Sequence, residues 1–366
     1  MPRWRYVFGF VLFVALSVMW VRDQATAHNV ASLSENLLVN GNFDELPFYG
    51  SISPNHYIAG GWYRWWIEGE GTEIPEFDDV DKPDGGRRDI HVDGTHAQVY
   101  HKYGPSYTAG IYQVVEGLTP CRPYELTMYA RNHSLPGVQP HARIGLDPFG
   151  AHLNTGEDLD ERGAVFDTAP LDRAVWSREQ TSLFVWEQLS VTAEPRGDKL
   201  TVILFASPEP GSDADHYYDT FWDAGALRPT TYEDDRLPTP AQPTSGFIHD
   251  VTWVSNTDSL TISWKLTTPA ITQISYGVST PSVITPTIPL THTAYLPLIS
   301  GPPPKYTPVD FDNGVSRVMT IPDLRPGQIV SWTILARRLD GDTCVTEYAG
   351  PFEAKLASAA HSETQH

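Results

Sequence analysis

Proline and glycine interrupt this chain so often that long helices are excluded. Its 366 residues include 31 Pro and 28 Gly. Proline in a helix interior removes a backbone donor and clashes with the preceding turn, and glycine there adds an entropic cost. The short segments between them are rich in aromatic residues, with 11 Trp, 17 Tyr and 14 Phe. Such residues pack well on pleated surfaces, so we predict an all-β protein.

Alternation of apolar and polar residues predicts a first β-sandwich. In Tyr124–Arg131, a period of two places Tyr124, Leu126, Met128 and Ala130 on one face, which we predict to be core. The predicted strands of this domain are Leu37–Val39, Ala97–Tyr100, Ala109–Val114, Tyr124–Arg131, Ala142–Leu146, Trp186–Ala193, Lys199–Ala206 and Tyr218–Leu227. Turn-forming residues 194–198 join two of them as a hairpin, which indicates antiparallel sheets.

A change of composition predicts a second, smaller sandwich. Residues 230–246 are rich in Pro, Thr, Ser and acidic side chains, which indicates a linker. The strands predicted after it are Ile248–Trp253, Ser259–Leu266, Ile271–Tyr276, Val315–Ile321, Ile329–Arg337 and Thr346–Phe352. A proline-rich insertion, residues 281–308, follows the third of these strands and is expected to be extended. Residues 357–366 are expected to form a disordered tail.

The N-terminus has the pattern of a secretory signal. Arg3 and Arg5 precede an apolar run, Tyr6–Val21, and the small residues Ala25 and Ala27 follow. This order predicts a signal peptide, residues 1–27, and a protein that is secreted or displayed on the cell surface. The alternative is a retained anchor, because the run approaches the roughly 17 to 25 residues that a tilted span needs. No later segment is expected to enter a membrane.

Charge and cysteine content limit the partners and the compartment. The formal net charge of −20 opposes nucleic-acid binding, and we expect none. Cys121 and Cys344 are the only cysteines, one in each predicted domain. In an oxidising compartment they are candidates for a disulfide, and two unpaired buried thiols are the alternative.

Short motifs carry a resemblance to known families. The first set is Asn36–Asp44, Gly60-Gly61-Trp62, Gly110–Gln113, Gly117–Pro120 and Trp222–Leu227. With these motifs, residues 35–229 resemble carbohydrate-binding modules of the galactose-binding jelly-roll type. The second set is Ser263-Trp264, Gln273–Gly277, Leu324–Gly327 and Ser331–Ile334. With these, residues 247–356 resemble a fibronectin type III domain, which implies an immunoglobulin-like sandwich that acts as a spacer or an adhesion module.

The jelly-roll resemblance also implies a structural calcium ion. In such domains calcium often joins the first and last strands, which here places Asp44 and Asp223 near it with carbonyl groups around Gly41. Hard oxygen ligands suit calcium, but two carboxylates are only part of the six to eight ligands it takes. The alternative is that both side chains cap exposed backbone groups in turns. No other cofactor is expected.

Sugar binding needs an aromatic platform beside planar hydrogen-bonding groups. If residues 62–66 are extended, alternation places Trp62, Arg64 and Trp66 on one face and Tyr63 with Trp65 on the other, and we expect one face to be core and the other free. A second segment, dense in aromatic and hydrogen-bonding groups, precedes Gly110. The predicted ligand-binding residues are Tyr63, Trp65, Trp66, Arg88, His91, Gln98, Tyr100 and Tyr103. Aromatic core residues are the alternative for each.

No catalytic motif supports an enzyme. His91, Asp93 and His96 lack the helical spacing of the familiar zinc motif, and no Gly-x-Ser-x-Gly elbow is present. We therefore predict a non-catalytic, exported protein whose jelly roll binds a polysaccharide or another glycan. A structural or adhesive surface protein without a sugar site is the alternative. A glycoside hydrolase comes third, because it needs two carboxyl groups facing each other roughly 5 to 9.5 Å apart.

Overall fold

A computed structural model describes most of the chain after the N-terminal segment. The described residues are 35–45, 49–50, 57–67, 69, 72–81, 91–135, 137–153, 166–209, 217–238, 242–243, 246–279, 303–312 and 314–357. The predicted signal peptide, Arg88, most of the proline-rich insertion and nearly all of the predicted tail lie outside them. Within this part of the chain, no helix is both long enough and apolar enough to cross a membrane.

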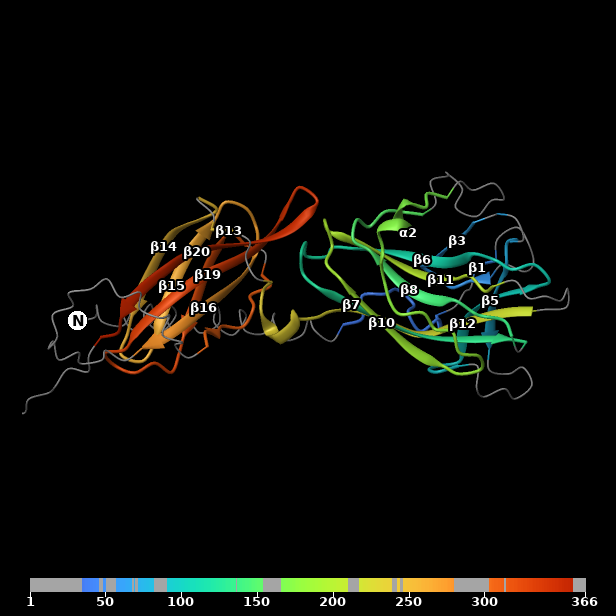
Figure 1. Ribbon diagram of the computed structural model, residues 1–366, viewed down its shortest axis with the longest axis horizontal. Coiled ribbons are helices and arrows are strands. Elements are labelled where there is room, and N and C mark those ends of the chain that lie inside the picture. Colours follow the sequence, from blue (N-terminus) through green and yellow to red (C-terminus); the bar gives the residue numbers. More distant parts are fainter. Residues whose placement is uncertain are drawn as a thin grey trace, which may run out of the picture. The chain divides into compact units, whose positions relative to one another are not determined.

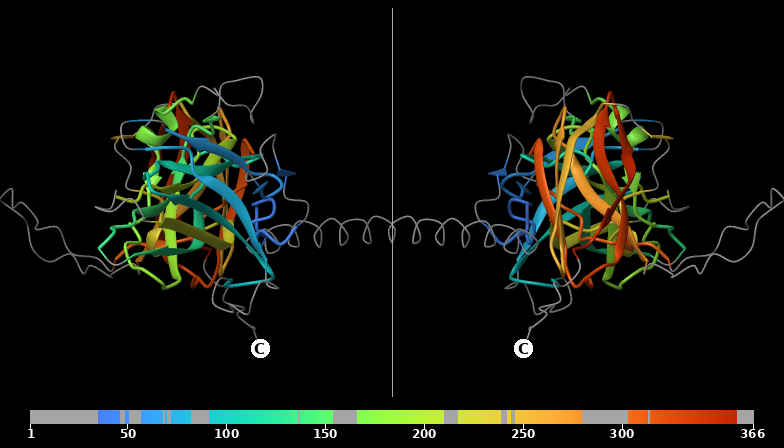
Figure 2. Two further views of the ribbon diagram at one scale, coloured as in Figure 1. Left: turned by 90° about the vertical axis from the view of Figure 1, so that its right-hand side faces the viewer. Right: turned by 90° about the vertical axis from the view of Figure 1, so that its left-hand side faces the viewer.

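The chain divides into two compact units (Figure 1). The first contains residues 1–116, 123–193 and 199–230, and the second contains residues 117–122, 194–198 and 231–366. Residues 117–122 and 194–198, which were predicted to be part of the jelly roll, therefore belong to the second unit. In the right-hand panel of Figure 2 the orange and red strands of this unit face the viewer.

The first unit is a jelly-roll sandwich of two five-stranded antiparallel sheets, in the orders β10-β7-β12-β5-β4 and β3-β6-β11-β8-β9. Its strands are β1 (Tyr49–Gly50), β2 (Tyr57–Ile58), β3 (Tyr63–Trp66), β4 (Glu76–Asp81), β5 (His96–Tyr103), β6 (Ala109–Glu116), β7 (Tyr124–Ser134), β8 (Ala142–Asp147), β9 (Val175–Trp176), β10 (Glu187–Ala193), β11 (Lys199–Ala206) and β12 (Tyr217–Pro229). Strands β1 and β2 form a separate pair, and one short helix, α2 (Ala169–Arg173), precedes β9. Figure 1 shows the two sheets as layers, with β6, β11 and β8 in one and β7, β10 and β12 in the other.

The core between these sheets follows the predicted alternation. Tyr124, Leu126, Met128 and Ala130 on β7 are all buried, as predicted. The largest fully buried side chain on β12 is Trp222. Burial of one such apolar side chain contributes roughly 1.5 to 3 kcal/mol, so two inward-facing sheets of this size supply the stability of the unit.

The second unit is also a β-sandwich, with sheets ordered β13-β20-β19-β16-β17 and β14-β15-β18. Its elements are η2 (Glu233–Asp235), β13 (Gln242–Pro243), β14 (Ile248–Ser255), β15 (Leu260–Leu266), β16 (Ile271–Ser279), β17 (Lys305–Tyr306), β18 (Ser316–Ile321), β19 (Ile329–Asp340) and β20 (Thr343–Lys355). Trp264 and Trp332 are buried in its core. An all-β protein with two sandwiches is confirmed, whereas membership of the fibronectin type III family stays a prediction.

Residues predicted as linker take part in the second unit. Tyr232 and Leu237 are buried with Ile271 and Leu335, and β13 pairs in parallel with β20. The predicted linker therefore contributes to the core of the second unit, because Tyr232 and Leu237 bury apolar surface there.

The two short jelly-roll segments are fixed within the second unit by covalent and ionic contacts. Cys121 and Cys344 form a disulfide, so the candidate pair is bonded and the alternative of two free thiols is wrong. Glu194 accepts two hydrogen bonds from Arg337, at 3.0 Å from Nε and 2.6 Å from Nη2. The hydroxyl of Tyr232 donates to the carbonyl of Cys121. A bidentate carboxylate–guanidinium pair and a disulfide hold these segments more firmly than turns alone would.

One predicted strand is absent. Residues 37–39 form a turn and not a strand. The side-chain amide of Gln113 takes the place of a strand neighbour, because its oxygen accepts from the Val39 N–H at 2.9 Å and its nitrogen donates to the Val39 carbonyl at 3.0 Å. The backbone groups of Val39 are therefore satisfied without a ladder.

Candidate functional site

Two of the predicted platform residues are buried. Trp65 has no exposed surface, and Trp66 is 5% exposed. The indole of Trp65 lies across Gly110, where an added Cβ would stand 2.8 Å from its Nε1, and it packs with Tyr112 and Ile203. Contact with a ligand by these two side chains is therefore contradicted.

The expectation that one face of residues 62–66 is free is also wrong. Segments that follow β8 cover the outer side of the sheet at this position, because Leu153, Phe166 and Leu171 pack against the cluster that contains Trp65. Arg64 and Trp66, which alternate to the other side, are buried as well. Only Tyr63 keeps exposed surface in β3, and its ring packs against Tyr112.

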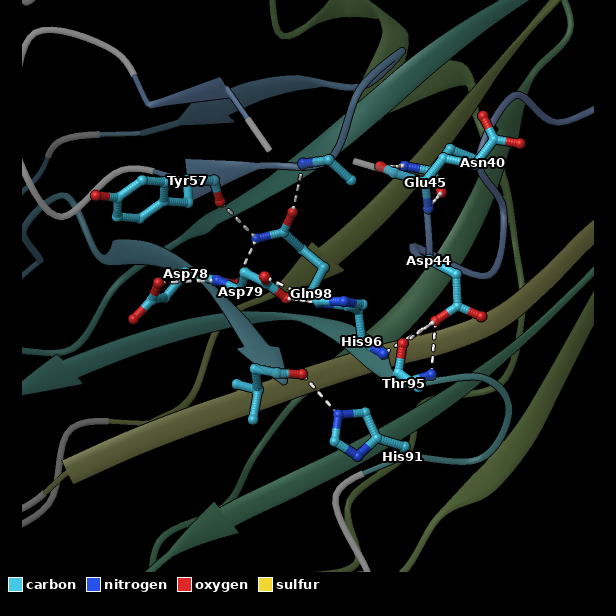
Figure 3. Close-up of polar contacts among 12 residues, drawn as sticks. Asn40, Asp44, Glu45, Tyr57, Asp78, Asp79, His91, Thr95, His96 and Gln98 are labelled. Carbon is cyan, nitrogen blue, oxygen red and sulfur yellow. Dashed lines mark hydrogen bonds and ion pairs between the residues drawn. The ribbon is translucent and has the colours of Figure 1, made fainter. Parts of the chain in front are cut away.

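Gln98 and Tyr100 are buried structural residues. Gln98 bonds three backbone groups: its Nε2 donates to the carbonyls of Tyr57 and Asp78, and its Oε1 accepts from the Ala59 N–H at 3.0 Å (Figure 3). Tyr100 accepts from the Ile111 N–H at 3.0 Å through its hydroxyl. Burial raises the pKa of the Tyr100 hydroxyl well above its ordinary value. A ligand cannot reach either group.

His91 and Tyr103 lie at opposite extremes of exposure. His91 is buried, and its Nε2 is 2.6 Å from the Val80 carbonyl (Figure 3), so it fixes β4 and does not face a ligand. Tyr103, at the end of β5, is 72% exposed and is available for contact. Arg88 lies outside the described residues. Of the eight predicted ligand-binding residues, the described part of the chain leaves Tyr63 and Tyr103 exposed.

Asp44 and Asp223 bind the backbone of the same loop, residues 91–96. Asp44 Oδ1 accepts from the N–H groups of Thr95 and His96, at 2.6 and 3.0 Å (Figure 3). Asp223 Oδ2 accepts from Val92 and Asp93, at 2.6 and 3.0 Å, and its Oδ1 accepts from Ala224. Burial raises the pKa of the Asp223 carboxyl, and the three backbone N–H groups offset part of that rise.

These contacts match the capping role that was the alternative to calcium. N–H donors are not calcium ligands, and both carboxylates are already turned toward such donors. Gly94 is required here, because its φ is +60° and an added Cβ would stand 1.5 Å from Asp44 Oδ2. No group of three or more His, Cys, Asp or Glu side chains in the described residues is placed to share a metal ion. Calcium binding at this loop stays a prediction that the contacts do not test.

We expect Asp223→Asn to lower the free energy of unfolding by about 2 kcal/mol, because the amide nitrogen cannot accept from the loop N–H groups that the carboxylate now binds. Urea titration measures this change. In the unaltered protein, excess EDTA is expected to leave the melting temperature within about 1 °C of its value in calcium, since capping needs no metal. A rise of several degrees on adding calcium would contradict the capping role and support a structural ion.

A different set of side chains forms a partly exposed polar and aromatic surface on the sheet β3-β6-β11-β8-β9. Pairing places Trp65, Gly110, Phe205 and Arg143 in one row across β3, β6, β11 and β8, and Gly145 with Trp176 in the next. Because side chains alternate along a strand, these two rows point to the same face. We call Arg143, Trp176 and Phe205, with His141 and Glu179 beside them, the aromatic–arginine face.

The guanidinium of Arg143 lies against two aromatic rings. Its Cζ is 4.1 Å from the centroid of the Trp176 ring and 4.6 Å from that of Phe205. The indole of Trp176 lies close over Gly145, where an added Cβ would stand 2.6 Å from it, and its N–H donates to the Leu171 carbonyl. Glycine in the middle of a strand is unfavourable unless something must approach closely, and here the indole does.

Charged groups surround this guanidinium. Glu179 is 4.0 Å from Arg143 and 2.8 Å from the Nδ1 of His141, and Glu209 is 3.5 Å from the other nitrogen of His141. Burial lowers the pKa of Arg143, and Glu179 partly offsets this. Arg143 remains charged at neutral pH. Its Nε is buried and has no hydrogen-bond acceptor in the described part of the chain.

The aromatic–arginine face was not predicted from the sequence. One signal was present: Gly145 interrupts a strand of otherwise larger residues, Arg143-Ile144-Gly145-Leu146. A glycine inside a strand often marks a close approach, but only the pairing of β8 with β9 shows that Trp176 is what approaches.

Comparison with known proteins finds solved structures that match this chain at low identity and low TM-score. No protein-family model matches the sequence, and a search of curated proteins finds no match. Among solved structures, the carbohydrate-binding module TmCBM61, in complex with β-1,4-galactotriose, is 14% identical with a TM-score of 0.33, over 54% of this chain and 100% of the module. The adhesin domain of Epf from Streptococcus pyogenes is 11% identical with a TM-score of 0.38, over 91% of this chain and 100% of that domain.

A third similar structure is the CBM22-1–CBM22-2 tandem domain of Xyn10C from Paenibacillus barcinonensis. It is 10% identical with a TM-score of 0.33, over 90% of this chain and 87% of the tandem domain. Carbohydrate-binding modules are thus among the structures that this chain is similar to. TM-scores below 0.5 do not carry a binding activity from one protein to another, so the ligand must be inferred from the residues of this chain.

Proposed function

We propose that this is an exported, non-catalytic glycan-binding protein, in which the aromatic–arginine face of the jelly roll binds the sugar and the second sandwich is a spacer. The observation that carries the proposal is the guanidinium of Arg143, held against the rings of Trp176 and Phe205 while 29% of its side chain stays exposed. The exposed part of this guanidinium can donate charge-assisted hydrogen bonds to ligand oxygens.

The chemistry of this face suits a neutral sugar. Aromatic rings pack against the C–H faces of a pyranose, and a planar guanidinium donates to two neighbouring oxygens at once. Glu179 and His141 lie beside Arg143, so acceptors are also present for sugar hydroxyl protons. Donors and acceptors in fixed positions beside a flat apolar surface are what sugar recognition requires.

Other observations support the remaining parts of the proposal. The disulfide between Cys121 and Cys344 fits an oxidising compartment outside the cytoplasm. The carboxylates of Glu179 and Glu209 both contact His141, an arrangement suited to hydrogen bonding and not to a free acid and base pair. These points favour binding over glycoside hydrolysis, the third prediction from the sequence.

We expect Arg143→Gln and Trp176→Ala each to weaken glycan binding about ten-fold or more, because one removes the charged donor and the other the flat surface. A glycan array identifies the ligand, and calorimetry measures the affinity of each variant. Trp253→Ala is the matched control, since Trp253 is a half-exposed tryptophan of the second unit, and its binding is expected to equal that of the unaltered protein.

Three outcomes would overturn parts of the proposal. Binding that survives both substitutions would place the sugar elsewhere. Failure of the unaltered protein to bind any glycan would favour the structural or adhesive alternative. Release of reducing ends from a bound polysaccharide would show an enzyme.

A further inference from the structure

The opposite sheet of the jelly roll, β10-β7-β12-β5-β4, carries a second aromatic surface. Four rings form a row across β7, β12 and β5: Phe184, His133, Tyr217 and Tyr103. Their successive centroids are 4.9, 5.0 and 6.1 Å apart. The two ends of the row are exposed, Phe184 by 47% and Tyr103 by 72%. We call these four residues the aromatic row.

Phe184 is held in an unfavourable backbone conformation to reach this surface. Its φ is +66°, a region that bulky residues rarely adopt. The hydrogen bond from its N–H to the Asn132 carbonyl, at 2.7 Å, fixes it beside β7. The next residue, Val185, is also exposed. The strained backbone at Phe184 places its ring in solvent and adds nothing to the core. Backbone strain of this kind is often found at binding sites.

Carboxylates outnumber cationic groups on the sheet face that carries the aromatic row. Pairing aligns Glu76, His101, Asp219 and His133 across four adjacent strands, with side chains on the outer face. His133 Nδ1 is 3.2 Å from Asp219, and His101 Nε2 is 3.6 Å from Glu76. The carboxylates of Glu76, Asp78, Glu125, Asp219 and the loop-binding Asp223 lie on this face, together with the guanidinium groups of Arg131 and Arg228. This excess of carboxylates over guanidinium groups makes the face acidic.

Exposed rings beside carboxylates attract cations, because the π faces and the carboxylates both stabilise positive charge. A ligand that lies across the face of a sheet is not expected to be a peptide, because peptides usually add to a sheet edge or enter a groove. A row of rings across strands fits successive flat sugar rings. We propose that the aromatic row is a second binding surface, whose ligand is an amine-bearing glycan such as a chain of glucosamine.

The two faces of the jelly roll then differ in chemistry. The aromatic–arginine face offers a fixed cation with aromatic rings, and the aromatic row offers carboxylates with aromatic rings. This second site does not depend on the first, so each can be tested while the other is left intact.

Calorimetry at pH 7 with a glucosamine hexamer tests the proposal, and the N-acetylated hexamer is the matched neutral ligand. The double variant Tyr103→Ala, Phe184→Ala is expected to bind the glucosamine hexamer about ten-fold more weakly, because two cation–π contacts are lost. The unaltered protein is expected to bind the acetylated hexamer about ten-fold more weakly than the free amine. Trp253→Ala, in the second unit, is expected to bind the glucosamine hexamer as the unaltered protein does.

The design separates recognition from general attraction to an acidic protein. The double variant keeps the formal net charge of −20, so equal binding by variant and unaltered protein would show charge attraction alone and overturn the proposal. Equal binding of both hexamers would overturn the requirement for an amine. A lysine hexapeptide that binds as tightly as the glucosamine hexamer, and loses affinity equally in the variant, would show a peptide surface instead. Both altered side chains are exposed, and a melting curve confirms that the variant is folded.

Discussion

Trp65→Ala is expected to lower the free energy of unfolding of the jelly roll by about 4 kcal/mol, the usual cost of truncating a large aromatic side chain in a core. Trp65 has no exposed surface and packs with Tyr112, Leu153 and Ile203. Its ring also lies on Gly110, so no neighbouring Cβ can move into the space that the indole leaves. The cavity would therefore persist, and the cost should fall at the upper part of the range for such substitutions.

Urea denaturation followed by circular dichroism measures this loss. Tyr103→Ala is the control, because its ring is largely exposed and its removal is expected to change stability by about 0.5 kcal/mol or less. A Trp65→Ala variant that melts like the unaltered protein but loses glycan affinity would contradict the structure and restore this residue as a ligand contact.

Replacing Cys121 and Cys344 by serine is expected to lower stability by about 4 kcal/mol. The disulfide joins residues separated by 223 positions, so it removes much of the freedom of the unfolded chain. The ion pair between Glu194 and Arg337 remains in the variant, but its net contribution is smaller, because both charges lose solvation when the pair is buried.

Melting in the presence and absence of a reducing agent measures the contribution of the bond. The reducing agent is expected to lower the melting temperature of the unaltered protein and to leave the double serine variant unchanged. A drop of equal size in both proteins would mean that the reducing agent acts through something other than this disulfide. Peptide mapping without reduction should recover residues 121 and 344 in one cross-linked fragment.

Local sequence patterns were sufficient for most strands. The alternation in Tyr124–Arg131 predicted β7 and its buried face, and the apolar run Lys199–Ala206 has the same bounds as β11. Strand formation depends on neighbouring residues and on burial of one face, and both are visible in a short window. The turn at residues 37–39 was missed because its partner, Gln113, is far along the chain.

The candidate sites were harder to predict for the same reason. Aromatic content marked residues 62–66 as a platform and Tyr100 and Tyr103 as ligand contacts, but composition does not show whether a ring is covered. Trp65 is covered by residues that follow β8, while Tyr103 is left exposed. Arg143, Trp176 and Phe205 come from three strands that are adjacent only after the sheet forms.

The sequence by itself determined the fold class, most of the strand positions and the inward faces of the jelly roll, because these follow from local periodicity and from the exclusion of helices by proline and glycine. Only the tertiary structure decided which aromatic residues are core and which are exposed, that Asp44 and Asp223 hold one loop, and that the two cysteines meet. Those features depend on contacts between residues from about 30 to more than 200 positions apart, which strand pairing and packing create and local patterns do not encode.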